Sequence, residues 1–167
     1  MILLDQLPDG ARIWVYQAGR ALTTAEIGAV LPHLARFAEE WTSHGRDLHA
    51  TAEILHQQFL VIGLDEGVAG ASGCSIDASV RFVGQLEQLL GTGLLDKSHL
   101  AFLHEGAVWR LRHSELKAAV AAGTVGPDTF YFDNTVATKG ELSRAWPRPA
   151  AQTWLARYFT PAQKNAL

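Results

Sequence analysis

The chain has 167 residues, of which 48% are hydrophobic and 19% are charged, and its formal net charge is -3. This balance is typical of a globular protein with a sizeable core, and it argues against disorder and against a general polyanion-binding protein. The single cysteine excludes an internal disulfide framework, and no apolar run approaches the roughly 20 residues of a membrane span. The first residues, Met1–Asp5, are too few and too acidic for the start of a secretory signal. We therefore expect a cytoplasmic protein with no part in the membrane.

The first half of the chain alternates between strand and helix patterns. The predicted elements are, in order, a strand at 12–17, a helix opened by the capping box Thr23–Glu26, strands at 48–54 and 59–64, and a helix at 75–90. Pro32 should kink or divide the first helix, and Gly45 should stop it. The strand at 59–64 is continuously apolar, which predicts a buried central strand.

The second half of the chain has shorter elements. They are strands at 100–103 and 107–111, a short helix capped by Ser114, a strand at 130–132, a helix opened by the capping box Thr138–Glu141, and a terminal helix at 154–159. The first six elements of the chain follow the order β-α-β-β-α-β of a split βαβ unit. We therefore predict an α+β fold, with a ferredoxin-like front half at 1–95. A small β-β-α-β part with C-terminal helices follows at 96–167, and the two parts could also form one continuous domain.

The stretch 66–77, which is rich in glycine and serine, contains the only cysteine, Cys74, directly before the second predicted helix. A helix N-terminus gathers unpaired N–H groups and partial positive charge, so it can hold an anion and can make a thiol reactive. The candidate ligand-binding residues are Ser72, Gly73, Cys74 and Ser75, through the backbone N–H groups of the last three and the two serine hydroxyls. Asp77 would support the helix N-terminus electrostatically.

Three interpretations of this stretch remain open. The first is a site for a small anionic ligand or for an acidic group of another protein. The second is a tight turn with a structural role, in which Ser75 caps the helix and Cys74 is small and buried. The third is a cysteine-dependent enzyme or redox sensor in which Cys74 acts as a thiolate with a histidine as base. The stretch contains no lysine or arginine, which favours the first two interpretations over the third.

Other kinds of chemistry lack their motifs in this sequence. No Gly-x-x-x-x-Gly-Lys-Ser/Thr phosphate loop is present, so we do not expect nucleotide hydrolysis. His49 and Glu53 share one face of a predicted strand, but at strand spacing their side chains lie roughly 13 Å apart, too far for one metal ion. The sequence predicts no metal site and no cofactor.

The C-terminal region, 139–167, carries five basic residues against one acidic residue, together with four aromatic residues. Its simplest interpretation is a set of helices whose aromatic faces pack on the core while the basic groups stay in solvent. The alternative is RNA binding through this basic tail. The central strand at 59–64 offers no surface aromatic residues of the kind an RNA-binding sheet presents, so nucleic-acid binding is the less favoured hypothesis.

Two resemblances extend this interpretation. Residues 13–17, 41–45, 72–77 with 79–82, and 134–141 resemble a family of short, uncharacterised bacterial proteins whose members are sometimes labelled transporter ATPases. Residues 115–132, with Trp146 beyond them, are similar to bacterial GYF-like adaptor domains. The second resemblance implies a protein-interaction module. Together with the motifs above, the sequence predicts a cytoplasmic binding or interaction protein rather than an enzyme.

Overall fold

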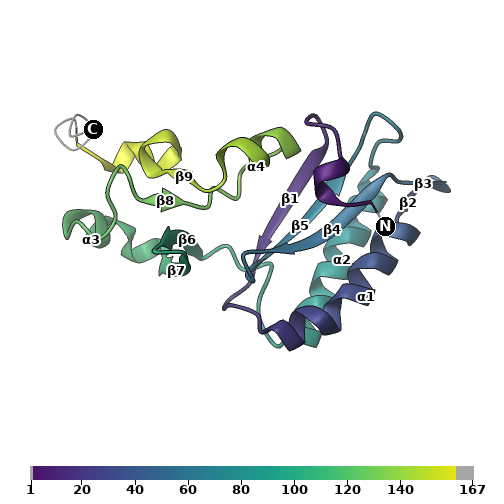
Figure 1. The fold of residues 1–167 in the computed structure, drawn as a ribbon, viewed down its shortest axis with the longest axis horizontal. Coiled ribbons are helices and arrows are strands. Elements are labelled where there is room, and N and C mark those ends of the chain that lie inside the picture. The colour runs from purple at the N-terminus through teal and green to yellow at the C-terminus, as the bar shows by residue number, and fades with distance from the viewer. Residues whose placement is uncertain (1, 161–167) are drawn as a thin grey trace. The chain divides into compact units, whose positions relative to one another are not determined.

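The computed structural model describes residues 2–160 and confirms the α+β class (Figure 1). The chain forms two compact units, one made of residues 1–96 with 134–144 and the other of residues 97–133 with 145–167. Residues 134–144 therefore belong to the first unit although they follow a strand of the second unit in sequence. No helix in the described part of the chain is both long enough and apolar enough to cross a membrane.

The first unit is a three-stranded antiparallel sheet with two helices on one face (Figure 1). The strands are β1 (Arg12–Gln17), β4 (Ala50–Leu55) and β5 (Phe59–Leu64), in the order β1-β5-β4. Every residue of β5 is buried, as predicted for a central strand. Helices α1 (Thr24–Glu40) and α2 (Gly73–Leu90) complete the core of this face. The fully buried members of that core include Val30, Leu34, Leu60, Ile62, Leu64 and Val83.

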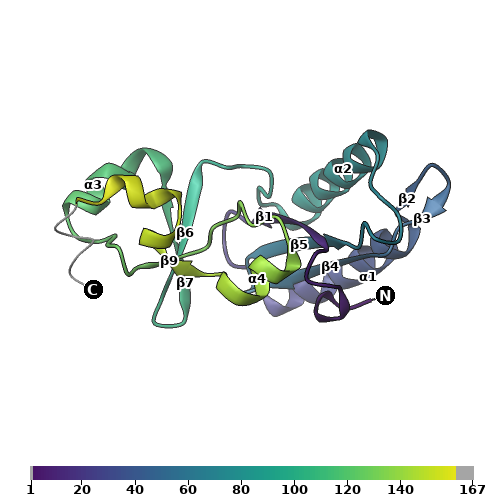
Figure 2. The ribbon, with the colours of Figure 1, turned by 90° about the horizontal axis from the view of Figure 1, so that it is seen from above.

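The predicted ferredoxin-like sheet is not confirmed. The order β1-β5-β4 is that of the first three strands of a split βαβ unit, but the fourth strand, predicted at 100–103, pairs in the sheet of the second unit. Residues 137–139 lie beside β1 instead (Figure 1, Figure 2). The N–H of Ile13 donates to the carbonyl of Ala137, and the N–H of Lys139 donates to the carbonyl of Ala11, each at 2.9 Å.

An ion-pair cluster holds the returning segment in the first unit. The carboxylate of Asp9 accepts from Lys139 Nζ at 3.2 Å and from an Arg144 guanidinium nitrogen at 2.8 Å. The hydrogen bond and charge of Lys139, with a smaller effect of Arg144, lower the pKa of Asp9 below its ordinary value. The short helix α4 (Lys139–Ala145) begins at this cluster.

The second unit is a four-stranded antiparallel sheet in the order β7-β6-β8-β9. The strands are β6 (His99–His104), β7 (Ala107–Arg112), β8 (Phe130–Tyr131) and β9 (Arg148–Pro149). Helix α3 (Leu116–Ala121) and the 3-10 turns at Ala150–Gln152 and Trp154–Tyr158 pack with the sheet around buried side chains that include Phe102, Leu116, Val125 and Leu155. The predicted terminal helix at 154–159 is therefore a 3-10 turn.

The structure corrects two local predictions for the first helix. Pro32 does not divide the first helix, because α1 continues through this residue. Pro32 is solvent-exposed, so the backbone acceptor that it leaves unpaired can be hydrated. The first helix stops at Glu40 rather than at Gly45. His44 and Gly45 both have positive φ and form the turn between strands β2 (Thr42–Ser43) and β3 (Arg46–Asp47).

The start of the second helix was also misplaced. α2 begins at Gly73, two residues earlier than predicted, and its N-cap is Ser72 rather than Ser75. Either serine satisfies the sequence preference for an N-cap, so the sequence alone could not choose between them.

Candidate functional site

The N-terminus of α2 is closed by a reciprocal pair of serines. The hydroxyl of Ser72 accepts from the N–H of Ser75 at 3.2 Å, and the hydroxyl of Ser75 accepts from the N–H of Ser72 at 2.8 Å. Ser75 is buried, and its hydroxyl also donates to the carbonyl of Ser72 at 2.8 Å. Both hydroxyls and one of the three predicted N–H donors are therefore engaged within the helix cap. Only the N–H groups of Gly73 and Cys74 have no partner in residues 2–160.

Cys74 is exposed, so the interpretation of a small buried cysteine is wrong. Its sulfur makes no hydrogen bond with a histidine, or with any other group, in the described part of the chain. An exposed thiol is open to modification, and a nucleophilic cysteine needs a base within hydrogen-bond reach. The structure thus leaves Cys74 accessible and without a hydrogen-bonded base among residues 2–160.

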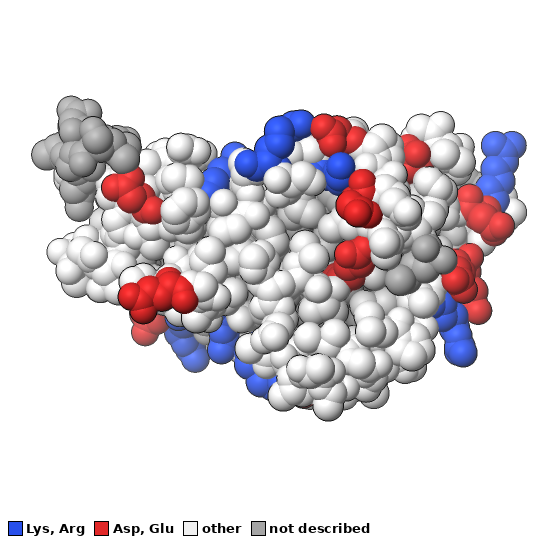
Figure 3. Space-filling model, in the orientation of Figure 1, with Lys and Arg blue, Asp and Glu red and all other residues white. Residues whose placement is uncertain are grey.

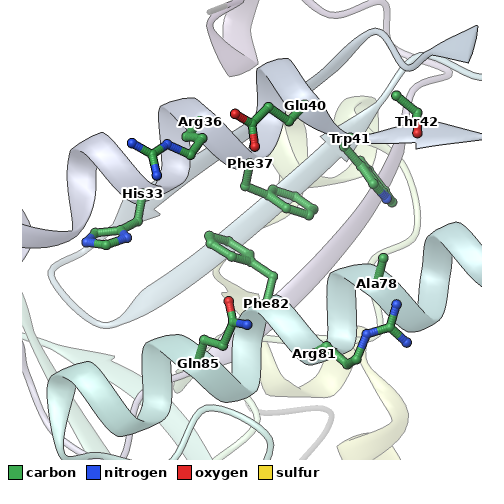
Figure 4. Close-up of a pocket in the computed structure, with 10 residues that line it drawn as sticks. All are labelled: His33, Arg36, Phe37, Glu40, Trp41, Thr42, Ala78, Arg81, Phe82 and Gln85. Carbon is green, nitrogen blue, oxygen red and sulfur yellow. The ribbon is translucent and has the colours of Figure 1, made fainter.

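A groove between α1 and α2 lies next to this helix start (Figure 4). Its volume is about 400 Å³, within the range of ligand sites. It is lined by His33, Arg36, Phe37, Glu40, Trp41, Thr42, Ala78, Arg81, Phe82 and Gln85.

Aromatic side chains bridge the two helices within this groove. Figure 4 shows Phe37 of α1 and Phe82 of α2 pointing toward one another, and their rings stack at 4.2 Å between centroids and 3° from parallel. Trp41 stacks on Phe37 at 5.1 Å, and its indole N–H donates to the carbonyl of Ser75 at 2.8 Å. This buried hydrogen bond ties the end of α1 to the first turn of α2. Phe37 and Phe82 are only partly buried, so the groove keeps an apolar surface open to solvent.

The charged groups of the groove are mostly basic. Arg36 and Arg81 stand on opposite helices, and His33 lies one turn before Phe37. The only carboxylate of the lining is that of Glu40. Neither arginine has an ion-pair partner in the described part of the chain, and both are exposed. The groove therefore combines a partly exposed aromatic surface with two available guanidinium groups.

The groove and the predicted site share one face of α2. Cys74, Ala78 and Arg81 are spaced by four and three residues, so they lie along one stripe of the helix. The free N–H groups of the first turn therefore stand at one end of this stripe and Arg81 stands two turns along it. A partner segment bound along this stripe would contact both the free N–H groups and Arg81.

The basic residues of the predicted tail are engaged with other groups where the structure describes them. Lys139 and Arg144 pair with Asp9, and Arg148 pairs with the buried Asp133 at 2.8 Å. Arg157 lies over the rings of Trp154 and Tyr158. Lys164, the remaining basic residue, is outside the described residues. On the face seen in Figure 3, lysine and arginine side chains lie in small groups next to acidic ones rather than in one field.

Comparisons with known proteins found no relative of this chain. No model of a protein family matches the chain, and neither the curated proteins nor the solved structures contain a match to it. Within residues 2–160 there is no group of three or more histidine, cysteine, aspartate or glutamate side chains that could hold a metal ion.

The sequence pointed to the N-terminal region of α2 as a candidate site but did not reveal the groove between α1 and α2. Phe37 is partly buried and packs against the core of the first unit, in which Trp41 is buried. A helical pattern shows which residues share a face, but it does not show that Phe37 meets Phe82 on another helix. The available signal in the sequence was an arginine directly before each phenylalanine, Arg36 before Phe37 and Arg81 before Phe82.

Proposed function

We propose that this protein is a binding protein, and that its first unit binds an acidic segment of a partner protein in the groove between α1 and α2. The observation that carries the proposal is the pair of unpartnered arginines, Arg36 and Arg81, on either side of the stacked Phe37 and Phe82. Each guanidinium group can donate two parallel hydrogen bonds to a carboxylate, and an apolar side chain can pack against the phenyl rings.

Two further features support the same class of function. The free N–H groups of Gly73 and Cys74 add hydrogen-bond donors at one end of the groove stripe, where the sequence predicted an anionic group. The resemblance of residues 115–132 to GYF-like adaptor domains implies protein interaction for the second unit as well. A cytoplasmic location belongs to this proposal.

The proposal is tested with a capped peptide that carries glutamates on both sides of one phenylalanine, and with its glutamine counterpart. We expect the glutamate peptide to bind more tightly by calorimetry, and its affinity to fall as the salt concentration rises. Arg36→Gln and Arg81→Gln should each weaken binding about two- to fivefold, the range expected for an exposed ion pair.

Arg46→Gln is the matched control, because Arg46 is an exposed arginine of the same unit that does not line the groove. It should leave the affinity unchanged. Equal binding of the two peptides, or equal losses in all three variants, contradicts the proposal. Substitution of Ser72 or Ser75 is a poorer test, because both hydroxyls cap α2 and their loss would disturb the helix itself.

A cysteine-dependent activity is the second candidate, and the exposure of Cys74 favours it. In that case Cys74→Ser would abolish a reaction with an electrophile or oxidant while leaving the affinity for the glutamate peptide intact. If the thiol reacts no faster than a free cysteine in a short peptide, this second candidate is excluded.

A further inference from the structure

The second unit has a cavity of its own, at the end of its sheet. The cavity has a volume of about 700 Å³ and lies between the β6–β7 hairpin and the loop that leads into β8. It is lined by Leu103, His104, Glu105, Ala107, Trp109, Thr124, Asp128, Thr129 and Phe130. None of these residues belongs to the α1–α2 groove.

The cavity contains one exposed and one half-buried aromatic residue. Phe130 is 47% exposed and is the one aromatic residue in the described part of the chain that counts as exposed. Trp109 is half-buried, and its indole stacks on the buried Phe102 at 4.7 Å and 21°. This stacking fixes the orientation of the indole from one side. Phe130 lines the cavity and is exposed, so it offers an apolar surface that a partner side chain can cover.

The charges of the lining are acidic. The carboxylates of Glu105 and Asp128 are exposed, and the lining contains no lysine or arginine. Nε2 of His104 lies 3.9 Å from a carboxylate oxygen of Glu105. Glu105 has a φ of +49°, and with Gly106 it forms the two-residue turn between His104 and Ala107. The tip of the hairpin thus presents a carboxylate at the mouth of an aromatic cavity.

We propose that this cavity binds an arginine- or lysine-bearing segment of a partner protein. The carboxylates of Glu105 and Asp128 would pair with the cationic head group. The ring of Trp109 is of the type that attracts a cation most strongly, and Phe130 would cover the apolar stem. The preference is opposite in charge to that of the α1–α2 groove, and it depends on residues of the second unit alone.

The test uses a capped peptide with two arginines between leucines, and the same peptide with citrulline in place of arginine, because citrulline keeps the shape and removes the charge. Binding is followed by calorimetry and by amide NMR shifts of Ala107 and Thr129. We expect saturable binding of the arginine peptide at least about fivefold tighter than that of the citrulline peptide. Glu105→Gln and Asp128→Asn should each weaken it about two- to fivefold, and Phe130→Ser about tenfold.

Glu115→Gln is the control, because Glu115 is an exposed carboxylate of the same unit outside the cavity. Arg36→Gln, which tests the first unit, should leave arginine-peptide binding unchanged. Equal affinity for the two peptides, no loss in the Glu105 and Asp128 variants, or no saturable binding at about 1 mM peptide would overturn the inference. An amide NMR spectrum of each variant without peptide shows whether the variant is folded, which separates loss of binding from loss of structure.

Discussion

The phenyl rings of Phe37 and Phe82 lie 4.2 Å apart between centroids and within 3° of parallel, and they join α1 to α2 across residues that are 45 positions apart in sequence. Both rings pack against the buried core of the first unit and are only partly covered. It therefore serves two purposes, since it stabilises the helix pair and keeps an aromatic surface at the groove.

The coupling between these rings is measurable. We expect Phe37→Leu and Phe82→Leu to be non-additive, with a coupling free energy of about 0.5–1.5 kcal/mol, as for other aromatic pairs in contact. Urea unfolding of the two single variants and the double variant gives this value. Additive losses would mean that the rings contribute only through their separate burial.

Trp41 should be more sensitive than a neighbouring tryptophan to loss of its indole N–H. Trp41→Phe leaves the buried carbonyl of Ser75 without this donor, which should lower the free energy of unfolding by about 1–3 kcal/mol. Trp14 lies against Trp41, at 6.0 Å between ring centroids, and its indole N–H has no partner in the described residues. Trp14→Phe is therefore the control, and a loss equal to that of Trp41→Phe would remove the hydrogen bond as the explanation.

Two glycine substitutions should have opposite effects on stability. A Cβ at Gly63 would lie 2.6 Å from Leu7 Cδ1 and 3.2 Å from Thr51 Cγ2, both in buried residues, so Gly63→Ala should destabilise the protein by about 1–3 kcal/mol. A Cβ at Gly84 inside α2 would meet nothing within 4 Å. Gly84→Ala should therefore raise the free energy of unfolding by about 0.5–1 kcal/mol through helix propensity. Thermal unfolding of both variants shows whether each one is less or more stable than the wild type.

The salt bridge between Glu26 and Arg20 predicts an acid-sensitive part of the stability. Arg20 donates to the Glu26 carboxylate at 2.6 and 2.9 Å, and the N–H of Thr23 donates to it at 2.8 Å. The Arg20 hydrogen bond, followed by that of Thr23, lowers the pKa of Glu26 from 4.5 to about 2.

The pKa is lower in the folded than in the unfolded chain, so this stabilisation is complete above pH 4.5 and is lost as the pH falls toward 2. The difference in unfolding free energy between the wild type and Glu26→Gln should therefore shrink over this window. Glu40→Gln is the control, because Glu40 has no ion-pair partner among residues 2–160. Parallel pH profiles for the wild type and Glu26→Gln would show that the pair does not contribute.

Cys74 should react in the folded protein. Because its side chain is exposed, a disulfide reagent such as Ellman's should titrate the single thiol without denaturant. The colour released in native buffer is compared with that in guanidinium chloride. Reaction only after unfolding would contradict the exposed position of the cysteine at the start of α2.

Much of the secondary structure was determined by local sequence. The capping box Thr23–Glu26 and the apolar run 59–64 predicted α1 and β5, because capping and burial patterns are local properties of the chain. The Ser72 cap was the weaker case, since a second serine three residues later satisfied the same preference. The hydrogen bond from Trp41 to the carbonyl of Ser75 is a tertiary contact at this helix start, and the local sequence did not show it.

The tertiary structure alone decided the arrangement of the strands and the two candidate sites. Strand pairing depends on contacts between distant residues, so the sequence could not show that 99–104 would join a second sheet while 137–139 would return to β1. The groove also depends on tertiary structure, because only the packing of α1 against α2 brings Phe37 and Phe82 together. Phe130 and Glu105 likewise lie far apart in sequence, and only the pairing of β6 with β7 and β8 brings them to one cavity.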